Sequence, residues 1–317
     1  MTPLQNAART ALESCLALRP GESLLVITDE PLRRIAYAFW EEGRILGAES
    51  MLLEMAPRRA HGDEPPELVV EAMKAADVVV CPTSKSLTHT AARRTACAEG
   101  TRVATLPGVT EEMMVRTLTT DYEAIADRTQ RVASALDAAA EAHLTSPAGT
   151  DIRLAIRTMD AIASTGLIRN PGEFGNLPSG EAYLSPDEGS AEGTFVVDGS
   201  MAGIGVVKTP IRFEVSKGFV TRISGGAEAR KLKGLLDPYG RKAMNVAELG
   251  VGTNDAAKIS GDLLEDEKVA GTAHIALGNN ISMGGTCDVP LHLDGLIRRP
   301  TLTLDGKVIL EQGQLKI

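Results

Sequence analysis

The sequence predicts a two-domain protein, in which an α/β domain with a doubly wound parallel sheet precedes a mainly antiparallel β domain. Over the first 145 residues, near-continuous apolar runs alternate with helical stretches, which is typical of parallel strands buried on both faces. Beyond that point apolar and polar residues alternate singly, and glycine or Asx turns separate the runs. A chain of 317 residues is long enough for two domains. We therefore expect domains at 1–145 and 146–317.

Apolar strands and helices follow one another regularly in the first domain. Runs such as ESLLVITDE (22–30) and DVVVCPTS (77–84) are β-rich, and a helical stretch follows each of them. The segment 119–143 is rich in alanine, the best helix former, and predicts one long helix. Right-handed crossovers should connect the strands. Strands are expected at 22–30, 49–57, 77–84 and 102–108, and helices at 1–22, 31–48, 66–76, 86–100 and 119–143.

The second domain is predicted to consist mainly of short antiparallel strands. Its clearest hairpin signal is LTLDGKVIL (302–310), where Asp-Gly separates two alternating runs. Helices are expected near 227–239 and 255–269. Further alternating runs are TDIRLAI, GTFVVDGSM, IRFEVSKGFVTRIS, NVAELGVGT and TAHIALG.

Composition and charge narrow the possible partners. The formal net charge is −9 and the isoelectric point is near 5.2, which argues against nucleic acid or an anionic membrane as a partner. No apolar stretch is long enough to cross a bilayer, and the N-terminus lacks the pattern of a secretory signal. The four cysteines are scattered without a CxxC pair, as expected of reduced cytoplasmic thiols. We expect a cytoplasmic protein that acts on a small molecule or a short peptide.

The stretch CDVPLHLDGL (287–296) contains the first candidate for a metal site. His292 and Asp294 stand two residues apart, so in a strand both side chains leave the same face. Imidazole and carboxylate are common ligands of zinc and iron. The alternative is a pair of ordinary polar residues near the end of a β-ribbon.

Three more residues of the second domain are candidate ligands. His274 lies in the alternating run GTAHIALGNN, and Glu181 follows a PSG turn at the start of another run. Glu248 is embedded in the apolar run NVAELGVGTN, where a buried carboxylate is costly unless it is paired or bound to a cation. The alternatives are a half-buried histidine satisfied by a carbonyl, an exposed loop glutamate, and an outward-facing strand residue.

Four segments of the second half, taken in order, resemble the metal-binding segments of the M29 metallo-aminopeptidases, also called the aminopeptidase T or thermophilic aminopeptidase family. These segments are NLPSGEAYLSP, AELGVGTN, GTAHIALG and HLD. The likeness covers mainly residues 170–295. It implies that five residues gather around one or two divalent ions, zinc, cobalt or manganese: Glu181, Glu248, His274, His292 and Asp294. It also implies a homodimer.

The M29 resemblance implies a hydrolase that removes N-terminal residues from short peptides. In such an enzyme a metal-activated water attacks the first peptide bond. The chain departs from the M29 pattern at Ile281, which stands where the family has a tyrosine ligand, and it is shorter than typical members. These departures make it a short variant with an altered substrate pocket.

Two other functions compete with peptide hydrolysis. His274, His292 and Asp294 alone form a two-histidine, one-carboxylate set, as in non-haem iron oxygenases, and the iron-dependent 2,5-dihydroxypyridine dioxygenases resemble the M29 proteins in fold and in this HxD end. Loss of the tyrosine is compatible with that ring-cleaving alternative, whereas retention of both glutamates favours the hydrolase. In the ring-cleaving enzyme His89 would be the base that deprotonates a phenolic substrate. The second alternative is a non-catalytic relative that binds a metal or ligand.

Overall fold

A computed structural model describes residues 1–317, which divide into two compact units. The first comprises residues 1–123 and 166–179, and the second comprises residues 124–165 and 180–317. None of the helices has the length and apolar character needed to span a membrane.

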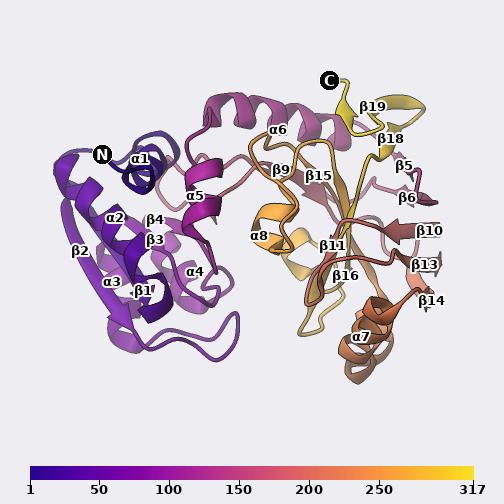
Figure 1. The fold of residues 1–317 in the computed structure, drawn as a ribbon, viewed down its shortest axis with the longest axis horizontal. Helices are drawn as coiled ribbons and strands as arrows, with labels where there is room; N and C mark the ends of the chain where they lie inside the picture. The colour runs from indigo at the N-terminus through magenta and orange to yellow at the C-terminus, as the bar shows by residue number, and fades with distance from the viewer. The chain divides into compact units, whose positions relative to one another are not determined.

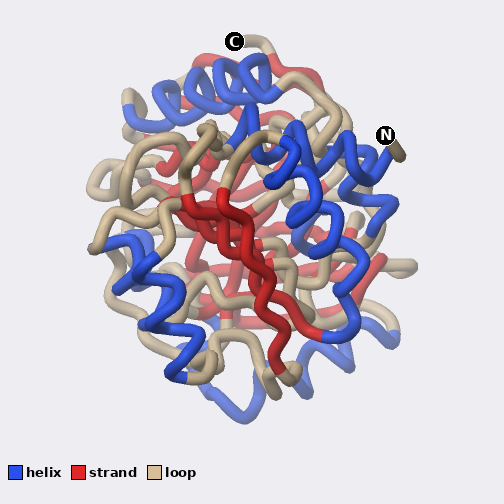
Figure 2. The backbone as a smooth tube through the Cα atoms, turned by 90° about the vertical axis from the view of Figure 1, so that its left-hand side faces the viewer, coloured by secondary structure: helices blue, strands red, loops and turns tan.

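The first unit is built on a five-stranded sheet with strand order β2-β1-β3-β4-β8, in which every neighbouring pair is parallel. Figure 2 shows these strands in red between helices in blue. The predicted parallel α/β domain is therefore confirmed. The strands are β1 (Ser23–Asp29), β2 (Glu49–Met55), β3 (Val78–Cys81), β4 (Arg102–Thr105) and β8 (Phe174–Asn176).

Helices cover both faces of this parallel sheet. Alternate residues of β1 point to opposite sides: Leu25 packs in one core with Met73 of α3, while Leu24 lies against Gly43 of α2. A Cβ at Gly43 would come within 2.4 Å of the Leu24 side chain, so the glycine lets α2 approach closely. The helices are α1 (Pro3–Thr10), α2 (Arg33–Ile45), α3 (Glu67–Ala75), α4 (Ala91–Ala98) and α5 (Glu111–Thr117).

The second unit contains two fully antiparallel sheets, and Figure 1 labels several of their strands. The eight-stranded sheet has the order β14-β13-β10-β6-β5-β18-β19-β20, and the seven-stranded sheet has the order β12-β11-β17-β16-β15-β9-β7. The eight strands are Phe219–Ser224, Ile211–Ser216, Glu192–Val197, Asp151–Ala155, Glu141–Thr145, Thr301–Leu304, Lys307–Glu311 and Gln314–Leu315. The seven are Gly205–Val206, Ser200–Met201, His292–Ile297, Ala273–Gly278, Val246–Gly252, Glu181–Leu184 and Ile162–Ser164.

One hydrophobic core joins these two antiparallel sheets. Phe195 and Phe213 of the eight-stranded sheet stack at 4.2 Å, and they share the core with Leu249 and Ile275 of the seven-stranded sheet. The helix α7 (Ala227–Leu236) adds Leu232 to the same core. Because this core takes up one face of the seven-stranded sheet, the opposite face is free to carry polar side chains.

Several predicted elements differ from the structure. The expected helix 119–143 ends earlier, as α6 (Tyr122–Asp137), and His143 lies in β5, where it pairs with both β6 and β18. Sheet pairing of the alternating EAHLT run overrides the helix propensity of its alanine. The helix expected at 255–269 is only one turn, α8 (Leu263–Asp266).

The unit boundary also differs from the one expected at residue 145. The chain leaves the first unit at Glu123 and returns over 166–179, because β8 adds to the edge of the parallel sheet. The hairpin at Asp305-Gly306 is confirmed, with φ of 45° and 84° at the two turn residues.

Candidate metal centre

The strand register of the seven-stranded sheet places the predicted polar residues on one face. Glu248 pairs with Ala276, which in turn pairs with Asp294, so the two carboxylates lie in the same row across β15, β16 and β17. His274 lies two residues before Ala276, and His292 two residues before Asp294. Since side chains alternate along a strand, all four share this face. Leu249, Ile275 and their neighbours on the other face enter the core.

Small residues between the polar ones open space on this face. Gly250 pairs with His274 across β15 and β16, and a Cβ at Gly250 would lie 2.0 Å from His274 Nε2. Ala276 separates Glu248 from Asp294. The imidazole of His274 therefore lies over the Gly250 backbone, where any larger residue would displace it.

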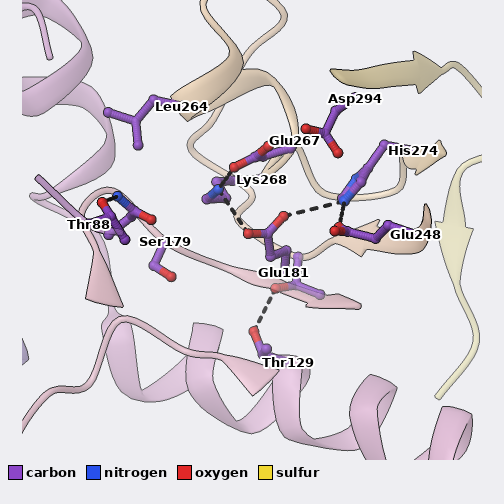
Figure 3. A network of polar contacts seen from close by, with 12 residues as sticks. Thr88, Thr129, Ser179, Glu181, Glu248, Leu264, Glu267, Lys268, His274 and Asp294 are labelled. Atoms are coloured by element: carbon purple, nitrogen blue, oxygen red, sulfur yellow. Dashed lines mark hydrogen bonds and ion pairs between the residues drawn. The ribbon is translucent and has the colours of Figure 1, made fainter. Parts of the chain in front are cut away.

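Glu248 lies between the two imidazoles. Its Oε1 is 3.1 Å from His274 Nε2, and its Oε2 is 3.2 Å from His292 Nε2. The same His292 nitrogen is 3.4 Å from Asp294 Oδ1. Glu248, His292 and Asp294 each offer one ligand atom, and these atoms all lie within 4.8 Å of one another. Figure 3 shows His274, Glu248 and Asp294 turned toward one another.

These spacings fit the donor set of a metal ion. Two atoms bound to one ion at about 2.1 Å lie about 3.0–3.5 Å apart at octahedral or tetrahedral angles. The contacts made by Glu248 and His292 fall in that range. His292 Nδ1 is 2.7 Å from the backbone carbonyl oxygen of Asn279. With a proton held on Nδ1 by that contact, Nε2, which faces the carboxylates, could offer its lone pair to a metal ion.

In the absence of a cation, protons take its place between these groups. Burial would lower the pKa of His274, but Glu248 and the nearby carboxylates outweigh burial and raise it to about 9. Burial would also lower the pKa of His292, but Asp294 and Glu248 outweigh burial and raise it well above its ordinary value. Burial would raise the pKa of Glu248, yet the hydrogen bonds from both histidines lower it. The site thus favours a positive charge at its centre.

Only one carboxylate oxygen of Glu181 lies beside the cluster. Its Oε2 is 3.5 Å from His274 Nε2, whereas its Oε1 is 2.9 Å from the ammonium nitrogen of Lys268. Lys268 also forms an ion pair with Glu267. Burial raises the pKa of Glu267, and the adjacent Lys268 ammonium opposes that rise. The structure therefore brings Glu181 to the cluster, as predicted, but pairs it with a lysine.

Three residues of the site were not found from the sequence. Glu267 and Lys268 lie in the charged run EDEKVAG, where the pattern indicates a solvated surface. Tyr183 follows Glu181 by two residues on β9, a spacing that already predicts a shared face. Burial, and then the carboxylates Glu181 and Glu248, raise the pKa of the Tyr183 phenol. Ile281 lies in a short 3-10 turn and is exposed, so it takes no part in the cluster.

His89 lies in the first unit, exposed, just before α4. Its backbone carbonyl accepts a hydrogen bond from Arg94. A catalytic role for His89 stays a prediction.

A family model described as NicX: 2,5-dihydroxypyridine 5,6-dioxygenase matches residues 3–317. The chain belongs to this dioxygenase family. A curated 2,5-dihydroxypyridine 5,6-dioxygenase of Pseudomonas putida is 29% identical in an alignment of 265 positions that covers 77% of this chain and 72% of that protein.

Two solved structures share the fold of this dioxygenase-family chain. A 2,5-dihydroxypyridine dioxygenase from Pseudomonas putida KT2440 superposes with a TM-score of 0.84 at 23% identity, covering 99% of this chain and 98% of that one. Wild-type AmpT from Thermus thermophilus superposes with a TM-score of 0.69 at 18% identity, covering 99% of both chains. The predicted M29 likeness therefore holds for the fold.

The predicted hydrolase function is wrong. Both the family model and the curated relative are dioxygenases, so the chain belongs to a family of enzymes but not to the aminopeptidases. In the sequence Glu181 and Glu248 are indistinguishable as candidate metal ligands, and two such glutamates favour a hydrolase. In the structure Glu248 contacts both histidines, while Glu181 is shared with Lys268.

Proposed function

We propose that this chain is a mononuclear iron-dependent dioxygenase that opens the ring of a dihydroxylated pyridine. The observation that carries the proposal is a chain of contacts on one face of the sheet, in which Glu248 contacts both His274 and His292, and His292 contacts Asp294. Two imidazoles and one carboxylate are the donor set of non-haem iron oxygenases. Membership of the 2,5-dihydroxypyridine 5,6-dioxygenase family supports this substrate class.

His274, His292 and Asp294 would hold the ion, and Glu248 supplies a further oxygen donor between the imidazoles. Bound iron(II) supplies the redox chemistry by which such a site uses O2. The protein's own contribution is orientation. The Asn279 carbonyl holds the His292 ring through Nδ1, and Gly250 leaves the space in which the His274 ring lies.

Substrate deprotonation is the second task of the protein. A ring hydroxyl must lose its proton as the ring is oxidised, and a histidine side chain is suited to accept it. We retain His89 as the proposed base. The imidazoles of His274 and His292 are unsuited to this role, because their nitrogens are directed at carboxylates within the metal cluster.

The proposal is tested with protein loaded anaerobically with Fe(II) and then mixed with 2,5-dihydroxypyridine in oxygenated buffer. We expect one O2 consumed per substrate, loss of the aromatic absorbance, and both atoms of ¹⁸O2 in the ring-opened product. The Asp294→Ala variant is the matched control, and it should lose iron and activity together. A folded, iron-loaded protein that consumes no O2 with this substrate would contradict the proposal.

A further inference from the structure

The loop that carries Lys268 brings a positive charge to the edge of the proposed metal centre. We propose that the Lys268 ammonium group occupies the place of a second metal ion and limits the centre to one ion. This inference rests on the proposed metal centre, and it does not depend on the reaction that the centre catalyses.

Lys268 is buried among carboxylates. Its side chain is 1% exposed, and its ammonium group forms ion pairs with Glu181 and Glu267. A buried ammonium is costly unless it is paired and hydrogen-bonded, so these two carboxylates stabilise it in one position. Figure 3 shows Lys268 joined to both glutamates, with Glu181 continuing to His274.

The backbone of the loop holds Lys268 in place. The Lys268 carbonyl accepts a hydrogen bond from the Asn254 amide at 2.8 Å, and its own amide donates to Glu265 at 2.9 Å. Gly252 permits this packing, because a Cβ there would lie 2.2 Å from the Val269 carbonyl oxygen and 2.8 Å from the Lys268 carbonyl carbon. Gly252 also pairs with Glu181 across β15 and β9. The lysine is therefore positioned over the strand that carries Glu181.

Glu181 links the ammonium group to the metal cluster. Its Oε1 is held by Lys268, while its Oε2 lies 3.5 Å from His274 Nε2 and has no hydrogen-bond partner. Without the ammonium charge, both oxygens of Glu181 would be available to a cation beside His274. With Lys268 present, a divalent ion at that position would be repelled by a buried like charge. Lys268 thus neutralises Glu181 without coordination chemistry.

The test compares metal stoichiometry in the wild type and in Lys268→Met, which keeps an unbranched side chain one atom shorter and removes its charge. Both proteins are dialysed against saturating Co²⁺, and the bound metal is measured by mass spectrometry and by the visible absorption of cobalt. We expect one ion per wild-type chain and two per Lys268→Met chain. The controls Lys268→Arg and Lys268→Met/Glu181→Gln should each bind one.

Four results would overturn the inference: two ions in the wild type, one ion in folded Lys268→Met, two ions in the double variant, or two in Lys268→Arg. No ion in the wild type would instead overturn the metal centre itself. If Lys268→Met does not fold by circular dichroism, Glu181→Gln in the wild-type background decides. That variant should still bind one Co²⁺ with less than a threefold change in affinity. Loss of the ion from it would make Glu181 a ligand and overturn the inference.

Discussion

Gly250 faces His274 directly across β15 and β16, and a methyl group at Gly250 would lie 2.0 Å from His274 Nε2. We expect Gly250→Ala to displace the imidazole and to lower the free energy of unfolding by about 1–3 kcal/mol. Metal affinity should fall as well, since His274 would lose its position. Thermal unfolding and metal titration measure the two effects.

The matched control for Gly250→Ala is Gly234→Ala in α7. No atom lies within 4 Å of a Cβ at Gly234, and alanine favours a helix, so this variant should be as stable as the wild type or more stable by up to about 1 kcal/mol. Unchanged metal affinity in a folded Gly250→Ala protein would show that the His274 position does not matter for the site.

His292→Ala should lose the metal while the chain stays folded. His292 contacts both Glu248 and Asp294, and its side chain lies at the start of β17 and is 32% exposed. Removal of a direct ligand should weaken metal binding more than about 100-fold, the upper end of what loss of a supporting contact costs. Equilibrium dialysis measures this change, and circular dichroism checks the fold.

His143→Ala is the control for His292→Ala. His143 lies in the eight-stranded sheet, where its Nε2 is 2.7 Å from Asp151. Its removal should leave metal binding unchanged. Equal metal retention by His292→Ala and His143→Ala would remove His292 from the centre.

Stability of the metal-free protein should fall between pH 6.5 and about 9. The pKa of His274 is raised from 6.5 to about 9, and the pKa of His292 is also raised. A raised histidine pKa contributes stability that is complete below 6.5 and is lost as the pH rises through the folded-state value. The loss should be on the order of 3 kcal/mol, since the histidines share Glu248. Urea unfolding with a chelator present measures it.

Saturating metal should flatten this pH dependence, because the ion replaces the protons on both imidazoles. Binding should also release protons, which can be followed with a pH indicator at pH 7.5. A metal-free protein whose unfolding free energy rises between pH 7 and 9 would contradict the protonated state of His274 and His292.

His89→Gln tests the proposed base separately from the metal. We expect unchanged iron content and a fall in turnover of about 10²–10⁴-fold. His61→Gln is the control, since His61 is exposed in the same unit and accepts a hydrogen bond from the Ser86 amide. Equal turnover in both variants would exclude His89 as the base.

The sequence alone determined the two kinds of sheet and the strand face on which the polar residues lie. Continuous apolar runs predicted the parallel strands, because both faces of that sheet are covered, and single alternation predicted the antiparallel sheets. The spacing of His292 and Asp294 placed them on one face of a strand, as the register confirms. Glu248 stood out because an isolated carboxylate in an apolar run requires a partner, and it contacts both histidines.

Only the tertiary structure decided how these residues pair. The return of 166–179 to the first unit, the sheet pairing of His143 and the burial of Lys268 all depend on contacts between residues far apart along the chain. A lysine in an acidic run has no local pattern that distinguishes a buried ion pair from a solvated one. Packing therefore sets the partner of Glu181. It also makes Glu181 and Glu248 different, because Glu248 contacts both histidines while Glu181 is held by the Lys268 ammonium.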